Sequence, residues 1–179
     1  MVTTVFNRFP ELTILINNAG VQIPLSFSDG IADETCIDLE LATNLIAPIK
    51  LSNRMLPLLC RQKSAALVFV GSALASVPKY GAPVYSSSKA AMHSFAQSLR
   101  AQLKGSAVQV FEVIPDLVDT AMTAGRHNVK KIQPEKLAAT VMEALKKNRH
   151  EILIGRTSLL YAINRLSPKL ARRIINQIS

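Results

Sequence analysis

Short apolar runs alternate with longer stretches of helical periodicity along this chain. The runs have the length of strands, are mostly apolar throughout and lead into polar residues, proline or glycine, as buried strands that end in loops do. They predict strands at 12–18, 66–71, 108–114 and 151–155. Between them, apolar residues recur three and four positions apart. This spacing predicts helices at 33–59, 85–104 and 134–147, and two short helices in 157–179.

Prolines and glycines divide these segments at interpretable places. Pro48 lies inside the 33–59 run and predicts a kink or a division into two helices. Gly105 follows the 85–104 run, where a helix C-terminus favours glycine. Pro134 suits the first turn of a helix, and Pro168 separates the two helices of the tail.

Strand and helix alternate, which predicts an α/β fold: a doubly wound, Rossmann-like parallel sheet with helices on both faces. Strands that are apolar throughout favour this arrangement, because both of their faces are buried. Polar residues follow the predicted strands: Asn17 and Asn18, then Ser72, then Asp116 after Pro115. The carboxyl ends of parallel strands share one edge of the sheet, so we expect these residues to lie along one edge.

Composition narrows the class of protein. The chain has 179 residues, of which 49% are hydrophobic and 18% charged, which fits a single domain over 1–179 with a real core. No apolar run is long enough to span a bilayer, and the N-terminus does not resemble a signal peptide. Cys36 and Cys60 form no Cys-x-x-Cys pair, so we expect reduced thiols and a cytoplasmic protein.

The net charge of +9 is unevenly distributed. Lysines and arginines balance the acidic residues over 1–125, so 126–179 carries the whole excess. Residues 157–179 read as a basic amphipathic helical tail. Such a tail can make weak contact with an anionic membrane surface, or it can cover the sheet or a partner subunit, or simply remain solvated. We expect no binding of nucleic acid.

Tyr85 and Lys89 carry the clearest chemical signal. They lie four residues apart at the start of a predicted helix and therefore on one face of it. A neighbouring ammonium favours the phenolate, which brings a tyrosine toward a useful range for proton transfer. Two common residues at this spacing also occur by chance, so the pair needs support from elsewhere. The histidines His93, His127 and His150 lack the spacing of a zinc site, and we expect no metal.

Four further motifs occur in order around that pair: Asn17-Asn18-Ala19-Gly20, then Asn44 in Ala-Thr-Asn-Leu-Ile-Ala-Pro, then Ser72 thirteen residues before Tyr85, and then Pro115-Asp-Leu-Val-Asp-Thr120. Together they resemble the short-chain dehydrogenase/reductase family, from about residue 12 to 155. Asp116 stands where the family usually has glycine. Taken singly, Asn18 or Ser72 could be a turn residue and Asn44 a simple hydrogen-bonded polar group.

The resemblance implies a hydride transfer between a nicotinamide cofactor, NAD or NADP, and a small carbonyl or alcohol substrate. Tyr85 would be the acid/base, Lys89 would favour its phenolate, Ser72 would hydrogen-bond the substrate oxygen and Asn44 would anchor a relay water. By the same resemblance, the cofactor-binding residues would be Asn18, Ala19, Gly20, Tyr85, Lys89, Pro115, Val118 and Thr120. The family also builds dimers from helices like 33–59 and 85–104, so we expect a homo-oligomer.

One expected motif is absent. The glycines at 20, 30, 71, 81, 105, 125 and 155 are never closer than ten residues, so there is no glycine-rich turn for a pyrophosphate. By the resemblance, the chain begins just before the family's fourth strand and lacks the first β-α-β-α-β portion. An exposed sheet edge would follow. Two functions therefore stay open: an oxidoreductase, or an inactive remnant that acts as an interaction or regulatory protein.

The tail and the short 121–133 segment resemble one subgroup of the family in particular. That subgroup contains the oxidoreductase of the teichoic-acid D-alanylation operon.

Overall fold

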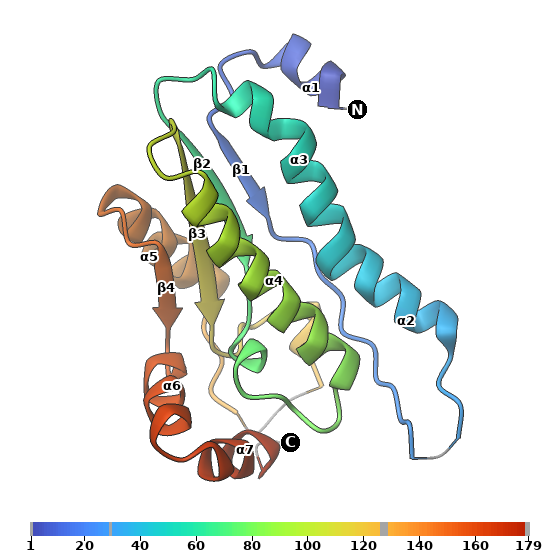
Figure 1. Cartoon of the computed structure of the whole chain (residues 1–179). Coiled ribbons are helices and arrows are strands. Elements are labelled where there is room, and N and C mark those ends of the chain that lie inside the picture. Colours follow the sequence, from blue (N-terminus) through green and yellow to red (C-terminus); the bar gives the residue numbers. More distant parts are fainter. Residues whose placement is uncertain (1, 29, 126–128, 178–179) are drawn as a thin grey trace.

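The computed structural model describes residues 2–28, 30–125 and 129–177. Within these ranges a parallel sheet of four strands runs in chain order, β1 (Ile14–Asn17), β2 (Ala65–Val70), β3 (Val108–Pro115) and β4 (Glu151–Ile154). The register pairs Ile16 with Val68, Val68 with Phe111, and Val113 with Ile152. All carboxyl ends therefore point to the same end of the molecule, as Figure 1 shows. The predicted α/β parallel sheet is confirmed.

The helices also follow the predicted order. They are α1 (Val2–Arg8), α2 (Glu34–Leu41), α3 (Ala47–Leu59), α4 (Pro83–Gln102), α5 (Pro134–Lys146), α6 (Thr157–Leu166) and α7 (Pro168–Gln177). The sequence pattern did not predict α1. The 33–59 run is indeed divided, but the division is a π-helical segment at Ala42–Ile46, just before Pro48. The helix expected at 85–104 begins earlier, with Pro83 in its first turn.

Helices cover both faces of the sheet. On one face α3 and α4 pack over a core that includes Leu59, Leu67, Phe69 and Met92, of which the first three are completely buried. Burying each such side chain stabilises the fold by about 1.5–3 kcal/mol. On the opposite face, α5 packs over the alternate residues of the same strands. The alternation explains why the strands are apolar at nearly every position.

The crossover connections β2–α4–β3 and β3–α5–β4 have opposite hands. β2 leads through α4 to β3, and β3 leads through α5 to β4, with each step in the same direction across the sheet. Because α4 and α5 lie on opposite faces, the two connections cannot have the same hand (Figure 1). Nearly all parallel crossovers are right-handed, so one of these two is a rare exception.

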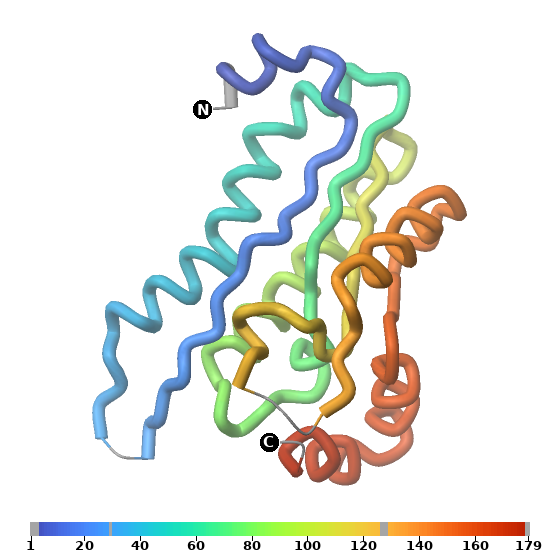
Figure 2. The backbone as a smooth tube through the Cα atoms, turned by 180° about the vertical axis from the view of Figure 1, so that it is seen from behind, coloured from blue at the N-terminus to red at the C-terminus, as the bar shows by residue number. Residues whose placement is uncertain are grey.

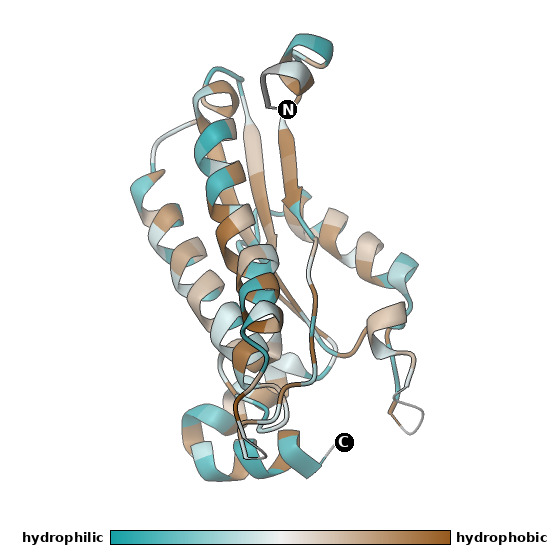
Figure 3. Ribbon diagram, turned by 90° about the vertical axis from the view of Figure 1, so that its right-hand side faces the viewer, coloured by the Kyte–Doolittle hydropathy of each residue, from teal (hydrophilic) through white to brown (hydrophobic). Residues whose placement is uncertain are grey.

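β1 is an edge strand of the described sheet, in agreement with the exposed edge expected from the sequence. It pairs with β2 on one side only, within the part of the chain that the structure describes. Ile14 and Ile16 alternate with the half-buried Leu15 and the buried Asn17, and they remain 44% and 52% exposed. Figure 3 shows this strand as a continuous hydrophobic stretch at the border of the sheet. An exposed apolar edge of this kind favours pairing with another strand.

The C-terminal helices lie beyond the carboxyl ends of the strands, close to the loops that follow β2 and β3 (Figure 2). Ala171 of α7 and Leu160 of α6 join Val77 in a small core of their own. Asn176 accepts a hydrogen bond from the Tyr80 N–H at 2.6 Å and donates to the Pro78 carbonyl at 3.3 Å. The tail is thus attached to the loop between β2 and α4, while basic residues and Leu166 face solvent.

Candidate active site

A cleft of about 500 Å³ opens at the carboxyl ends of β1, β2 and β3. Ordinary small-molecule sites have this size. Most of the residues predicted from the sequence line it: Asn18, Ala19, Gly20, Ser72, Tyr85, Lys89, Pro115, Val118 and Thr120. The side chains come from strand ends and from α4, which are brought together because parallel strands end at one edge. Asn44 is the exception, since it lies behind the cleft wall.

Lys89 is deeply placed. Only 5% of it is exposed, and its Nζ donates a hydrogen bond to the Val70 carbonyl at the end of β2, at 2.8 Å. Burial lowers the pKa of Lys89 from 10.5 to about 8, and the charge of Glu112 acts in the opposite direction. The lysine is therefore close to its titration point near neutral pH and can exchange a proton there.

Tyr85 stands one helical turn before that ammonium. Lys89 Nζ lies 5.6 Å from the centre of the tyrosine ring, so the positive charge is close enough to favour the phenolate. Ser72 follows β2 in an extended conformation and begins a short 3₁₀ turn, Ala73–Ala75. Its Oγ accepts a hydrogen bond from the Leu74 N–H at 3.2 Å, which leaves the hydroxyl hydrogen able to donate.

Asn44 holds the chain that leaves β1. Its amide donates to the Val21 carbonyl at 2.8 Å, and its Oδ1 accepts from the Val21 N–H at 2.9 Å. The same amide lies 3.2 Å from Ser88 Oγ on α4, beside Lys89. A Cβ on Gly20 would approach Asn44 Oδ1 to 3.3 Å, so the glycine permits this close fit. Asn44 therefore joins α4 to the segment that forms one wall of the cleft.

The π-helical turn explains how Asn44 reaches Val21. Ala42–Ile46 is wound more widely than an α-helix, and such turns often occur at functional sites. One turn earlier, the buried Glu40 accepts from the Ile23 N–H at 3.4 Å, and burial raises the pKa of its carboxyl. Two side chains of this helix thus hold the 21–23 segment.

Asp116 has a partner that the sequence pattern did not reveal. Arg156 Nε lies 2.6 Å from Asp116 Oδ2, and its Nη2 lies 3.3 Å from Oδ1, so the ion pair is bidentate. Burial favours the neutral form of Asp116, but hydrogen bonds from Arg156 and the Leu117 N–H hold the pKa of this carboxyl below its ordinary value. Gly155, with a φ of +77°, lets β4 approach: a Cβ there would lie 2.8 Å from Asp116 Cβ. The pair ties the ends of β3 and β4 together beside the cleft.

Known proteins are similar in sequence to this chain over most of its length. The sequence profile described as short chain dehydrogenase matches residues 1–131. This chain belongs to the short-chain dehydrogenase family. The oxidoreductase DltE of Bacillus subtilis (strain 168), named as uncharacterized, is 36% identical over 151 residues, 81% of this chain and 60% of its own length. An oxidoreductase of Staphylococcus aureus (strain USA300) is 31% identical over 144 residues, which are 79% of this chain and 62% of that one.

Solved structures of the family agree with the fold. A short chain dehydrogenase from Burkholderia cenocepacia J2315, solved in complex with NADP, superimposes with a TM-score of 0.83. It is 26% identical, and the match covers 97% of this chain and 73% of that one. A family member from Burkholderia phymatum, solved with NAD, has a TM-score of 0.79 at 18% identity, over 92% of this chain and 70% of the other.

The comparisons confirm the short-chain dehydrogenase resemblance and the closer likeness to the oxidoreductase of the teichoic-acid D-alanylation operon. The chain spans about 60% of the length of the curated relatives that it matches. In the part of the chain that the structure describes, every helix is too short or too polar to traverse a bilayer.

Proposed function

We propose that this protein is a nicotinamide-dependent oxidoreductase in which Tyr85 is the acid/base. The observation that carries the proposal is the position of Tyr85 and the buried Lys89 on one wall of the cleft, with Ser72 on the strand end opposite. Family members that superimpose on the chain were solved with NADP and with NAD, which supports either cofactor here. The substrate class is a small carbonyl compound or alcohol.

The residues present fit one end of such a cofactor. Lys89 supplies a cation, and the segment from Pro115 to Thr120 supplies a wall and backbone groups at the cleft. When bound, the nicotinamide supplies or accepts the hydride, which no side chain can do. Tyr85 then delivers a proton to the substrate oxygen, or removes it in the reverse direction. Ser72 donates a hydrogen bond to the same oxygen as negative charge develops there.

Lys89 and Asn44 support the tyrosine. The ammonium of Lys89 favours the Tyr85 phenolate, and its titration near pH 8 allows it to pass on a proton at neutral pH. Asn44 contacts Val21 and also Ser88, the residue before Lys89, so it is suited to anchor a water between the lysine and solvent. Of the residues predicted to bind the cofactor, Asn18, Ala19 and Gly20 follow β1, whereas Pro115, Val118 and Thr120 lie at and after the end of β3.

Titration of the 179-residue chain with NADPH and with NADH, followed by reduced-nicotinamide fluorescence, tests the proposal. We expect saturable binding and turnover of some member of a carbonyl panel, with Tyr85→Phe abolishing turnover while binding persists. Tyr80→Phe is the matched control, because Tyr80 is 70% exposed and outside the cleft lining. A folded sample that binds neither nucleotide at millimolar concentration would overturn the proposal for this chain.

A second candidate is an inactive family remnant that works by interaction. The exposed Ile14 and Ile16 on the open edge of the sheet favour it, as does the lack of a glycine-rich turn in the sequence. It predicts concentration-dependent assembly without nucleotide binding. Sedimentation of the chain at several concentrations measures the assembly, and the fluorescence titration measures nucleotide binding. A chain that remains a monomer and binds NADPH contradicts the remnant hypothesis.

We further infer a single domain, a cytoplasmic location and a homo-oligomer for the active form. The weak membrane contact predicted for 157–179 is a separate proposal, supported by the basic and exposed apolar residues of α6 and α7, such as Arg165 and Leu166. Co-sedimentation with anionic vesicles at low salt tests it, and no binding under those conditions would refute it.

A further inference from the structure

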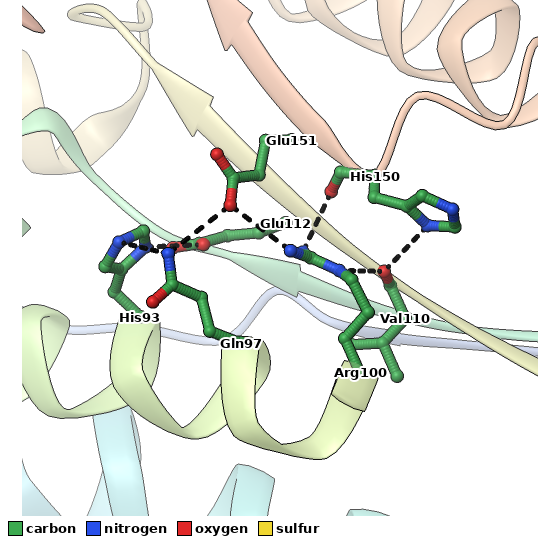
Figure 4. A network of polar contacts seen from close by, with 7 residues as sticks. All are labelled: His93, Gln97, Arg100, Val110, Glu112, His150 and Glu151. Atoms are coloured by element: carbon green, nitrogen blue, oxygen red, sulfur yellow. Dashed lines mark hydrogen bonds and ion pairs between the residues drawn. The ribbon is translucent and has the colours of Figure 1, made fainter. Parts of the chain in front are cut away.

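A buried carboxylate lies beneath the active-site strand end. Glu112 is in the middle of β3, and none of it is exposed. Its Oε2 is 2.7 Å from His93 Nδ1 on α4, one turn after Lys89 (Figure 4). A charged group is rarely buried in a protein interior unless it is paired.

The contacts around His93 assign the proton positions. Gln97 Nε2 lies 3.1 Å from His93 Nε2 and 3.4 Å from Glu151 Oε1. An amide nitrogen only donates, so His93 Nε2 is the acceptor and His93 Nδ1 carries the hydrogen. The Nδ1–H then donates to Glu112 Oε2. Arg100 holds Glu151 from the other side at 3.2 Å, and this completes the network in Figure 4.

The second oxygen of Glu112 faces the end of β2. Glu112 Oε1 is inaccessible to solvent and has no hydrogen-bond partner within the described residues. It lies against Gly71, where an added Cβ would come within 2.6 Å of it. Gly71 comes directly after Val70, whose carbonyl accepts the hydrogen bond of Lys89. The carboxylate therefore adjoins the residue that follows the carbonyl to which Lys89 is bound.

Charge complements this geometry. The ionisable groups whose charges act on Glu112 or respond to it are His93, Arg100 and Lys89 of α4, Glu151 of β4 and Tyr161 of α6. Burial raises the pKa of Glu112, and His93 is the first group that opposes this rise. In return the charge of Glu112 raises the pKa of Lys89 against the effect of burial. A buried ammonium without a countercharge would lose its proton more readily.

We propose that the Glu112–His93 pair is a positioning unit for Lys89, which it supports by holding the β2 end at Gly71 and by placing a carboxylate near the lysine ammonium. The inference rests on the proposed function, since it assigns a second layer to the same site. Glu112 does not touch the cleft, so it acts through Lys89 and not on the substrate.

The test follows the titration of Lys89 in the 179-residue chain. Lysine labelled with ¹³C at Cε gives one NMR signal per side chain, and the Lys89 signal is the one that disappears in Lys89→Met. We expect a midpoint near pH 8 in the parent chain. In Glu112→Gln, the midpoint moves to lower pH, because the amide keeps the shape but removes the charge. His93→Leu moves it in the same direction, because the carboxylate loses the partner that opposes the rise in its pKa and is protonated more readily.

Glu151→Gln is the matched control. It removes a carboxylate from the same network, but Glu151 is 43% exposed and contacts Arg100 and Gln97 instead of Gly71. The Lys89 midpoint therefore stays where it is in the parent chain. A folded Glu112→Gln variant with an unchanged Lys89 midpoint overturns the inference. If that variant does not fold, His93→Leu decides by the same measurement, since His93 lies partly at the surface.

The Lys89 titration can be measured whether or not the chain is an oxidoreductase, so the two proposals can fail separately. The titration uses neither nucleotide nor substrate, so a chain that binds no nicotinamide still reports whether Glu112 supports Lys89. If nucleotide binding fails and the midpoint shifts, the oxidoreductase proposal falls and the positioning pair stands. If nucleotide binding and turnover are found and the midpoint does not shift, the oxidoreductase proposal stands and the positioning pair falls.

Discussion

Replacing Gly155 with alanine tests how the chain accommodates Asp116 where its family usually has glycine. Gly155 has a φ of +77°, in the left-handed region that disfavours residues with a side chain. An alanine Cβ would lie 2.8 Å from Asp116 Cβ and 2.9 Å from Ile132 Cδ1. Asp116 cannot swing away easily, because Arg156 and the Leu117 N–H hold its carboxylate.

Two costs combine in this variant. The left-handed backbone costs about 1–2 kcal/mol for a residue with a Cβ. Overpacking against Asp116 and Ile132 costs about 1–3 kcal/mol more. We therefore expect Gly155→Ala to lower the free energy of unfolding by about 2–5 kcal/mol. The ends of β3 and β4 would separate, and the cleft wall at residue 116 would move with them.

Urea denaturation followed by far-ultraviolet circular dichroism measures the loss. With a slope of about 2 kcal/mol per molar urea, the midpoint falls by roughly 1–2.5 M. Gly81→Ala is the control, because its added Cβ meets no described atom within 4 Å and its φ is outside the left-handed region. A change of less than about 0.5 kcal/mol in Gly155→Ala, the size of an ordinary surface substitution, would refute the reasoning.

A double-mutant cycle separates the two costs. In an Asp116→Gly background the nearest atom is gone, while the φ at residue 155 and the contact with Ile132 remain. Gly155→Ala should then cost less than it does beside Asp116, by about 1 kcal/mol. Equal costs in both backgrounds would show that the φ and the contact with Ile132 account for the loss and that Asp116 does not depend on Gly155.

Two further predictions concern Lys89 and Asn44. Because the pKa of Lys89 is about 8 in the fold and 10.5 for an ordinary lysine, the unfolded chain binds the extra proton between these values. The free energy of unfolding therefore rises with pH from about 8 to 10.5 through this group, and Lys89→Met removes that part of the rise. An identical pH dependence of the urea midpoint in both chains would contradict it. Asn44→Ala loses both hydrogen bonds to Val21 and the contact with Ser88, and should destabilise the fold by about 2–3 kcal/mol. Faster hydrogen exchange at the Val21 amide accompanies this, and an unchanged rate would count against the role of Asn44.

The regular elements could be predicted because each follows from local chemistry. Apolar runs of strand length and helical periodicity depend on residues a few positions apart, and turns carry their own signals in proline and glycine. The errors lie at boundaries: α4 begins at Pro83, before the predicted start at Tyr85, and α1 has little apolar periodicity to reveal it. The π-helical turn at Ala42–Ile46 is stabilised by contacts of Asn44 with Val21, a residue far away in the sequence.

The candidate site divides in the same way. Tyr85 and Lys89 lie on one helix, and Ser72 and Pro115 come after strands, so their proximity follows from spacing and from the parallel sheet. Glu112 could not be assigned to the site in this way, because in the sequence it is one polar residue inside an apolar strand. The packing of α4 on β3 brings His93 against Glu112. The pairing of β3 with β2 brings the same carboxylate next to Gly71.

The sequence by itself determined the order of the four strands and of the helices after α1, the family and the residues at the strand ends, since these depend on hydrophobic periodicity and on short motifs. The tertiary structure decided which charges meet. Arg156 pairs with Asp116 across 40 residues, and the charge of Glu112 on β3 acts on Lys89 of α4. Such pairs depend on the crossing of helices over the sheet, and electrostatic effects depend on distance and burial in space, which no position in the sequence specifies alone.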